Sequence, residues 1–580
     1  MSTRSTKPLH QVRLLPLAAC LAIAFSNPAS AKNPNANRTF DRFDERGAGW
    51  FGDALPELRS LRHAGSASKT LAPTGNTIGV NNCNDAGAGS LRAAVASAHS
   101  GDTVDLSKLR CATITLTSGA ITTALDDLTI VGPGKNNVAI DGNLSDRVLL
   151  HSGTGTLSLS NVTLTHGQAT TVSAFNAPGH VSGGCLNSAG SIGLNHAALI
   201  ACDASSATES AYGGGAHAQG YATLVSSQVA GNTVHAPRHA IGAGILADYG
   251  ITVRGSLITG NAATATGTAA LEAGASVDAS MGGLGTLYDL DISDSVIRGN
   301  TVSASSALAD QVVVANEAGV MAFGTLTLVR STISDNAGQA INTGSSAGVY
   351  VYAYAVGGGA RAASFFVSDS TISGNSTSAI ASNSQGVGVE GSSGAGARTF
   401  TLDGTVSFTN STISGNTSSR SASAYYAYGY AYGGGVFGNG VALTLNNSTV
   451  AFNSAEQGSG VYQYRSADIS VNSTIIGDNS SSVGGPEFGT AYAETVAGAN
   501  NLIMSVNANV SLPLDTLSTD PLLAPLGSNG GPTFTHALMP HSPAIDAGNN
   551  VATLVFDQRG PGHPRLVGAR PDIGAYEFKH

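Results

Sequence analysis

The chain of 580 residues is long enough for several domains or for one extended array of repeats. Only 11% of its residues are charged and 74 are glycine, so helix formers are scarce and the composition favours short strands joined by tight turns. A formal net charge of −10 argues against a nucleic-acid partner, because phosphate binding requires clustered Lys and Arg.

Residues 1–31 have the features of an export signal. An apolar run from Leu14 to Phe25 follows basic residues, and Ala29-Ser30-Ala31 provides a small-x-small cleavage site. Alternatively, the sequence Leu17-Ala18-Ala19-Cys20 resembles a bacterial lipobox, which would make Cys20 a lipid anchor. Because the apolar run continues past Cys20, we favour cleavage after Ala31 and a secreted or cell-surface protein. No other segment is long and apolar enough to predict a transmembrane span.

A flexible leader is predicted for residues 32–75, which are charged and poor in apolar residues. A short helix is predicted near residues 90–99, with Ser90 as its N-cap. Its apolar face contains Leu91, Ala94, Val95 and Ala98. Such a helix would cover the open end of a repeat array that begins at residue 76.

A hexapeptide with the consensus STISGN recurs nine times at intervals of 25 to 41 residues. The copies begin at Ala198, Ser227, Ser256, Ser295, Ser331, Ser370, Ser411, Ser448 and Ser473, and a degenerate tenth copy begins at Val162. The third position is always β-branched and apolar: Ile200, Val229, Ile258, Ile297, Ile333, Ile372, Ile413, Val450 and Ile475. The sixth is Asn or Asp: Asp203, Asn232, Asn261, Asn300, Asn336, Asn375, Asn416, Asn453 and Asp478.

This period predicts a solenoid, and the absence of helix-forming stretches favours a parallel β-helix with one strand and one corner per hexapeptide. The third residue of each copy should stack in a continuous core. The sixth should take the left-handed turn conformation and form a hydrogen-bonded ladder. The longer intervals indicate insertions of about ten residues, mostly between the Asn corner and a following glycine cluster.

Two insertions alternate tyrosine with small residues, at positions 349–354 and 426–432. Period-two alternation places their tyrosines on one side of an extended strand. Aromatic rings with a polar edge suit sugar stacking, although the alternative is that the rings simply stack on one another between coils. The candidate glycan-contact residues are Tyr350, Tyr352, Tyr354, Tyr426, Tyr428, Tyr430 and Tyr432.

Four cysteines follow the signal: Cys83, Cys111, Cys185 and Cys202. An exported chain meets an oxidising compartment, where an even number of cysteines favours disulfides over buried thiols. Among the three possible connectivities we predict the local one, Cys83–Cys111 with Cys185–Cys202.

The repeat stops after about residue 498, and residues 499–580 are richer in proline and charge. The segments Asn529-Gly530-Gly531-Pro532-Thr533 and Ser542-Pro543-Ala544-Ile545-Asp546-Ala547-Gly548 make this tail resemble the choice-of-anchor Q domain, as do Asp520-Pro521-Leu522, Asp557-Gln558-Arg559-Gly560 and Asp572-Ile573-Gly574-Ala575-Tyr576-Glu577. The preceding repeats resemble right-handed, single-stranded parallel β-helix proteins of pectin-lyase-like fold, with a weaker similarity to polymorphic outer-membrane repeats. These resemblances imply an exported bacterial surface protein with a C-terminal cap domain.

Candidate chemical groups are few. Asp289, Asp291 and Asp294 form the densest acidic cluster, which could hold Ca²⁺ but is more typical of a solvated outer face. The histidines from His151 to His239 lack the compact spacing of a metal site. Arg559, Arg565 and Arg570 should pair with Asp557, Asp572 or Glu577.

We therefore expect no cofactor and predict a non-catalytic exported β-helix that acts at the cell surface or in the matrix, in adhesion or glycan binding. The alternative is a polysaccharide lyase or glycoside hydrolase, and a cleft with converging charged residues would distinguish it.

Overall fold

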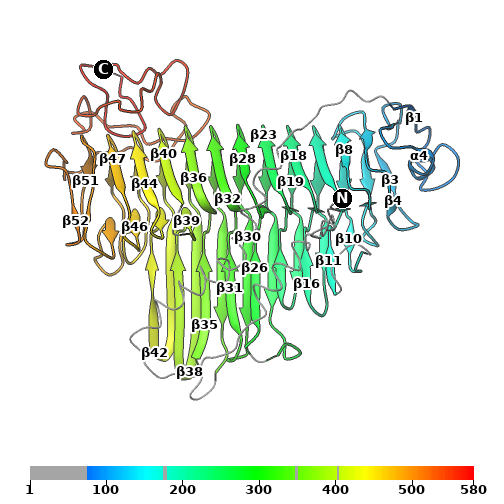
Figure 1. The fold of residues 1–580 in the computed structure, drawn as a ribbon, viewed down its shortest axis with the longest axis horizontal. Coiled ribbons are helices and arrows are strands. Elements are labelled where there is room, and N and C mark those ends of the chain that lie inside the picture. Colours follow the sequence, from blue (N-terminus) through cyan, green and yellow to red (C-terminus); the bar gives the residue numbers. More distant parts are fainter. Residues whose placement is uncertain (1–74, 174–178, 273, 346–349, 402–403, 580) are drawn as a thin grey trace, which may run out of the picture.

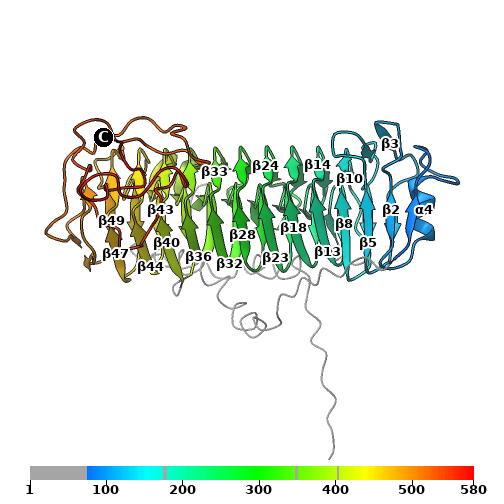
Figure 2. The ribbon, with the colours of Figure 1, turned by 90° about the horizontal axis from the view of Figure 1, so that it is seen from above.

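The computed structural model describes residues 75–579, apart from 174–178, 273, 346–349 and 402–403. Short strands stack coil upon coil along one axis, and the strands pair in parallel from coil to coil (Figure 1, Figure 2). The chain is therefore an all-β parallel β-helix, as predicted. The predicted signal and leader, with Cys20, lie outside the described residues.

Three sheets run along the stack. The hexapeptides build the first, which we call the narrow sheet, and Ile333, Ile372 and Ile413 pair directly with one another in it. Its strands are β3 (Thr113–Thr115), β6 (Ala139–Asp141), β9 (Thr163–Thr165), β14 (Ala198–Ile200), β19 (Gln228–Ala230), β24 (Leu257–Thr259), β29 (Val296–Arg298), β33 (Thr332–Ser334), β37 (Thr371–Ser373), β41 (Thr412–Ser414), β45 (Thr449–Ala451), β48 (Ile475–Gly477) and β51 (Leu502–Ile503).

The long sheet forms the opposite wall of the solenoid, and most coils contribute two consecutive strands to it. Its strands are β1 (Thr77–Gly79), β2 (Thr103–Asp105), β4 (Ile121–Thr123), β5 (Leu128–Val131), β7 (Leu149–His151), β8 (Thr156–Ser160), β12 (Leu186–Ser188), β13 (Ser191–Asn195), β17 (Ala216–Ala218), β18 (Tyr221–Val225), β22 (Ile245–Ala247), β23 (Gly250–Arg254), β27 (Leu284–Thr286), β28 (Leu290–Ser293), β32 (Val320–Val329), β36 (Ala360–Ser368), β39 (Ala397–Thr399), β40 (Thr405–Thr409), β43 (Val436–Gly438), β44 (Ala442–Asn446), β46 (Val461–Gln463), β47 (Ile469–Asn472) and β49 (Phe488–Thr490).

The third sheet contains the insertions and projects from the solenoid as a two-layered fin (Figure 1). Each coil from β10 to β42 sends one arm outward from the Asn corner and returns by a second arm to the glycine cluster. The strands of the fin are β10 (Gln168–Ala169), β11 (His180–Ser182), β15 (Asp203–Ser205), β16 (Ser210–Tyr212), β20 (Thr233–Ala236), β21 (His239–Ile241), β25 (Ala262–Thr266), β26 (Ser276–Ser280), β30 (Thr301–Ser306), β31 (Val312–Asn316), β34 (Ala337–Asn342), β35 (Tyr350–Val356), β38 (Ser376–Ser393) and β42 (Thr417–Tyr432). Two further strands, β50 (Glu494–Thr495) and β52 (Val510–Ser511), pair separately.

Two hydrophobic cores follow from this layout. The solenoid core is built mainly from Leu, Ile and Val, and Ile372 is completely buried in it. The fin core is built mainly from Ala and Val, including Ala353 and Ala379 on facing arms. The insertions therefore form a second core of their own.

The Asn corner forms the predicted ladder. From Asn232 to Asn453, each corner asparagine donates its backbone N–H to Oδ1 of the corner asparagine in the next coil, at 3.0–3.1 Å. The left-handed conformation, however, lies one residue earlier than predicted. It is adopted by the fifth residue of the hexapeptide, as at Gly374 and Gly415, whose φ angles are 65° and 66°.

A second ladder runs beside the first. The backbone N–H of Ser227 donates to Oγ of Ser256, and the same contact joins the first residues of successive hexapeptides as far as Ser448 and Thr474. This explains why the first residue of the hexapeptide is almost always serine, which the repeat alone did not reveal.

The two end copies are in a different register from the one predicted. Leu199 rather than Ile200 pairs with Val229, and Ile476 rather than Ile475 pairs with Val450. Ile200 is only partly buried, and Ile475 is buried against the C-terminal tail. Each of these copies therefore begins one residue away from the predicted start, because the alignment followed Ile rather than the ladder residues.

Consequently the ladder positions at the ends are not Asp203 and Asp478. Cys202 takes the first, where its N–H donates to Oδ1 of Asn232 at 3.0 Å, and Asn479 takes the last, where its Oδ1 accepts from Asn453. The Cys185–Cys202 disulfide thus lies at the end of the ladder, and Cys83–Cys111 is also formed. Both predicted disulfides are confirmed.

The helix α4 (Leu91–Ser97) covers the N-terminal end of the stack (Figure 1). Ser90 is its N-cap, since its side chain accepts the N–H of Ala93 at 3.2 Å, and Leu91 and Val95 are buried in the solenoid core. Parallel pairing continues beyond residue 498, where Leu502 pairs with Ile475. No helix among the described residues is long and apolar enough to cross a membrane.

Candidate functional sites in the corner and on the fin

A cluster of charged and polar side chains lies at the corner where the chain passes from the fin to the long sheet. Asp278 in β26, Asn316 and Glu317 at the end of β31, and Arg361 in β36 come from three successive coils. Asp278 and Arg361 point away from both cores because each alternates with core residues, Asp278 with Val277 and Ala279 and Arg361 with Ala360 and Ala362. We call Asp278, Asn316, Glu317 and Arg361 the corner cluster.

Hydrogen bonds connect the corner cluster. Asp278 Oδ1 accepts from Ser280 Oγ at 2.6 Å and from Asn316 Nδ2 at 3.2 Å. Arg361 Nη1 donates to Glu317 Oε1 at 2.7 Å and to Asn316 Oδ1 at 3.4 Å. Asn316 therefore connects the two carboxyl groups: it donates to Asp278, and it accepts from the Arg361 guanidinium, which in turn contacts Glu317.

Burial controls the charge of this cluster. It raises the pKa of Asp278 to about 7, and the nearby Glu317 carboxylate adds to this, while the hydrogen bonds from Ser280 and Asn316 oppose it. Burial also raises the pKa of Glu317 against the attraction of Arg361. The arrangement is thus one ion pair beside a carboxyl that readily holds a proton.

All these groups are buried: Asp278 and Glu317 have no exposed surface, and Arg361 exposes 4%. Asp278 Oδ2 and Glu317 Oε2 accept no hydrogen bond from the described residues. A carboxyl pair with a guanidinium resembles the groups of an acid–base site, but a polymer must reach such groups to be cleaved by them.

The histidines do not form a metal site with this cluster. His217 Nε2 lies 3.1 Å from Asp248 Oδ1, and burial lowers the pKa of His239 to about 3, which keeps its ring neutral. No group of three or more His, Cys, Asp or Glu suited to a metal ion occurs in the part of the chain that the structure describes.

In the coils that follow, aromatic side chains lie in the corner beside the arginines. The guanidinium of Arg361 lies 5.0 Å from the centre of the Phe400 ring, and that of Arg398 lies 4.7 Å from Phe437. Tyr462 follows, with its ring centre 4.5 Å from that of Tyr432. Such contacts stabilise the cations in a desolvated position.

The predicted tyrosines of β35 line the outer face of the fin. The rings of Tyr350, Tyr352 and Tyr354 lie side by side on β35, with centre-to-centre distances of 6.1 and 6.2 Å. Tyr350 is 41% exposed and Tyr354 is buried. Their neighbours Val351 and Ala353 belong to the fin core, so the period-two prediction of sidedness holds for these three residues.

The second row lies two strands away, on β42. Tyr354 pairs with Gly391 of β38, and Gly391 pairs with Tyr430, so β38 separates the two rows. Tyr430 is 48% exposed, and its ring centre is 5.5 Å from that of Tyr432. The side chains of Tyr426 and Tyr428 lie outside the described part of the structure.

A third group of tyrosines was not anticipated. Tyr221, Tyr249 and Tyr288 come from successive coils at the bend of the long sheet, with ring centres 5.6 Å apart. These rings stack on one another along the solenoid axis. Their spacing of 28 and 39 residues is close to that of the repeat and could have revealed them.

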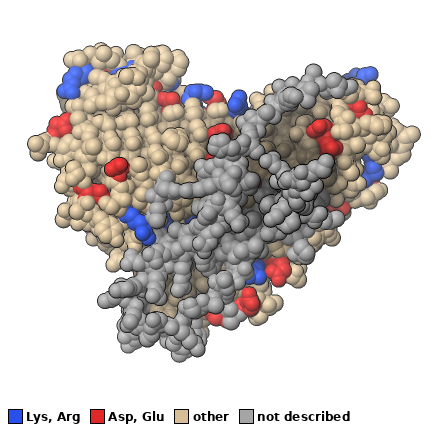
Figure 3. Space-filling view, in the orientation of Figure 1, with Lys and Arg blue, Asp and Glu red and all other residues tan. Residues whose placement is uncertain are grey.

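The acidic cluster in the long sheet is spread over the surface. Asp294 forms a two-pronged ion pair with Arg330 at 2.7 and 2.8 Å, and Asp289 accepts the N–H of Thr325. Asp291 is exposed on β28. On the face shown in Figure 3, charged side chains are few and scattered.

The C-terminal tail, in red in Figure 1, folds back across the last coils of the narrow sheet. Gln558 donates to the carbonyl of Ser370 and to Thr371 Oγ1, and Thr449 Oγ1 accepts the N–H of Ala575. The tail therefore docks on the threonines at the starts of the repeated strands.

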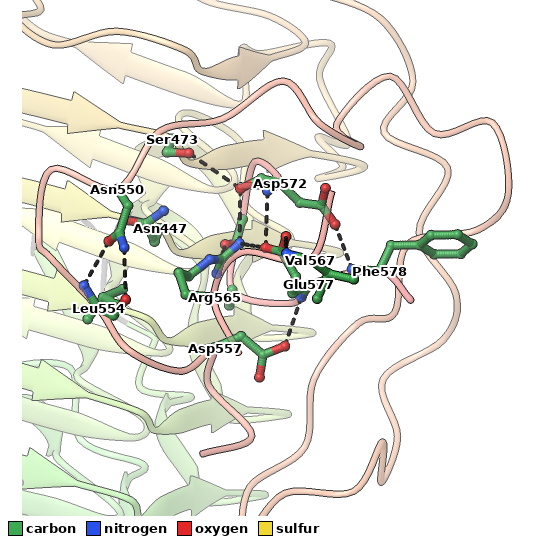
Figure 4. A network of polar contacts seen from close by, with 12 residues as sticks. Asn447, Ser473, Asn550, Leu554, Asp557, Arg565, Val567, Asp572, Glu577 and Phe578 are labelled. Carbon is green, nitrogen blue, oxygen red and sulfur yellow. Dashed lines mark hydrogen bonds and ion pairs between the residues drawn. The ribbon is translucent and has the colours of Figure 1, made fainter. Parts of the chain in front are cut away.

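Buried ion pairs hold the tail in shape (Figure 4). Arg565 contacts Glu577 at 2.9 Å and donates to the carbonyl of Asp572 at 3.0 Å, and Arg559 pairs with Asp557. The pairing expected of Arg559 and Arg565 is thus present. Burial raises the pKa of Glu577 to about 7.

The corner cluster was missed because its members come from different coils and are dispersed in the sequence. One signal was available: in nearly uncharged insertions, Asp278, Glu317, Arg361 and Arg398 stand within a few residues of a glycine cluster. Placing them at equivalent points of consecutive coils would have brought them together.

Neither a protein-family model nor a curated protein matches the chain. Among solved structures, a crystal structure of the pectate lyase Pel9A is similar at 12% sequence identity, with a TM-score of 0.29. The match covers 87% of this chain and 96% of that one.

Proposed function

We propose that this protein is an exported, non-catalytic β-helix that binds polysaccharide at the cell surface or in the extracellular matrix. The observation that carries the proposal is the pair of tyrosine rows on the outer face of the fin, in which Tyr350 and Tyr430 are 41% and 48% exposed. Aromatic rings bury the apolar face of a sugar while the phenol keeps a polar contact. An exposed aromatic surface on a rigid scaffold is typical of a binding site.

Two features support an extracellular setting. The two disulfides fit an oxidising compartment. The resemblance of the tail to the choice-of-anchor Q domain supports a role in anchoring at the cell surface, which is part of this proposal.

The test uses the variant Tyr350→Ser/Tyr430→Ser, with Tyr221→Ser as the matched control. Tyr221 is also 48% exposed but stacks on Tyr249 at the bend of the long sheet. Loss of a dominant aromatic contact costs about 1 kcal/mol or more, so we expect binding on a glycan array to weaken at least about fivefold. The control should bind like the wild type. Equal binding by the double variant would refute the proposed site.

The corner cluster favours a second candidate, a polysaccharide lyase or hydrolase, because two carboxyls and a guanidinium converge there. A panel of uronate and neutral polysaccharides, with product release as the readout, tests this function. Product release by the wild type and its loss in Asp278→Asn and Glu317→Gln would establish it. The complete burial of both carboxyls makes us rank this candidate second.

A further inference from the structure

The fin widens along the chain and then ends abruptly. Its outward arms lengthen from three residues in β15 to four in β20, five in β25 and six in β30. The last strand, β42, covers both arms with 16 residues. In the next coil, a short connection takes the place of both arms. It bridges only the two ends of β42, at Thr417 with Ser454 and at Tyr432 with Gln457.

The outer edge of β42 is consequently a long strand edge. β38 pairs with β42 on one side, and on the other side no strand among the described residues pairs with residues 419–429. An unpaired edge is a template for strand addition, which natural proteins usually blunt with Lys, Pro or a short edge strand. β42 contains neither Lys nor Pro, and it is among the longest strands of the fin.

The single charge of this edge is already neutralised. Arg420 Nη1 contacts Glu390 Oε1 at 2.6 Å inside the fin, and its Nε contacts Glu456 Oε2 at 2.9 Å. Two such edges would therefore not repel each other through Arg420, and the ion pairs close the base of the fin core.

We infer that β42 is the interface through which two copies of this chain associate, edge to edge and antiparallel. A two-fold arrangement presents the same residues on both sides and closes at two copies. Head-to-tail pairing is disfavoured because the opposite edge of the fin tapers to β10 and β11, of two and three residues. Among the described strands at the two edges of the fin, only identical edges match in length.

The solenoid determines how the copies face each other. The coils from β43 onward extend past the edge of the fin (Figure 1). Two solenoids on the same side would collide there. The two bodies must therefore lie at opposite ends of the paired fins, and each arm of β42 then meets the same arm of the other copy.

The experiment measures the mass of the exported, unreduced protein by light scattering after size exclusion. The edge variant is Ser419→Lys/Ser421→Lys, since both serines are exposed on β42 and like charges opposed across an antiparallel pair are destabilising. The matched control, Ser378→Lys/Ser382→Lys, adds the same charge to the outer face of the neighbouring strand β38. This test is independent of glycan binding.

We expect a dimer for the wild type and the control, and about half that mass for the edge variant at an unchanged melting temperature. The variant Ala422→Pro removes an edge N–H instead of adding charge, and should also give a monomer. A monomeric wild type, an edge variant that stays dimeric, or a larger open assembly would overturn the inference.

Discussion

The solenoid and the fin show how one pairing scheme supports two different interiors. Both are built from parallel strands in register, yet the solenoid core contains Leu, Ile, Val and Phe, whereas the fin core contains little besides Ala and Val. Large side chains hold three walls apart around a filled interior. Small ones let two arms pack face to face. The size of the buried residue, more than the strand pairing, determines which shape a coil adopts.

The largest expected effect is in the solenoid core. Ile372→Asp buries an unpaired charge in a completely buried position and should destabilise the protein by about 3–5 kcal/mol. The control Ser407→Asp lies on the outer face of β40 and should change stability by no more than about 0.5 kcal/mol. Denaturant unfolding measures both, and equal stabilities would contradict the solenoid core.

The next effect concerns the end of the ladder. Replacing Cys185 and Cys202 by Ser removes a bridge that spans 17 residues, worth on the order of 3 kcal/mol in the chain-entropy model. The melting temperature of the oxidised wild type and of the double variant gives the comparison. An unchanged value would show that the bridge adds nothing to the ladder.

A smaller effect distinguishes the two cores. Ala353→Leu overfills the thin fin core and should cost about 1–3 kcal/mol, while Ser378→Leu, on the outer face of the fin, should be nearly neutral. Hydrogen exchange should show the loss of protection within the fin and little change in the solenoid. Uniform loss across both regions would mean that they unfold as one unit.

The smallest effect is a change in pH dependence. An unfolded Asp titrates near 3.9, and burial raises the pKa of Asp278 in the folded protein to about 7. Its protonated form therefore contributes stability that is complete at low pH and is lost as pH rises through 7. The melting temperature of Asp278→Asn should fall less than that of the wild type between pH 4 and 8. Parallel curves would rule out this assignment. Glu577 is present in both proteins and cancels from the comparison.

Much of this fold could be predicted because each coil needs the same type of buried residue and the same type of corner residue. Ile372 and Asn375 recur at fixed positions, so their burial and ladder follow from the sequence. The end copies were misaligned because Ile200 and Ile475 mimic the core residue while the ladder position is taken by Cys202 and by Asn479. The fin was visible only as longer intervals, since its Ala-rich interior has no strong hydrophobic pattern.

The candidate functional sites were harder to predict than the fold, for a different reason. The tyrosine rows could be found because alternation within one strand is a local signal, whereas the corner cluster depends on contacts between coils some 40 residues apart, such as Asn316 with Asp278 at 38. Variable insertion lengths hide such alignments. The burial that sets the charge of Asp278 is likewise a property of the assembled coils.

The most direct test of the central claim is to run the wild-type protein through gels that contain a panel of polysaccharides and to assay the same mixtures for cleavage products. A binding, non-catalytic protein is retarded by at least one polysaccharide and releases no reducing ends or unsaturated uronates. Free migration in every gel, or product release from the polysaccharide that retards it, would contradict the account.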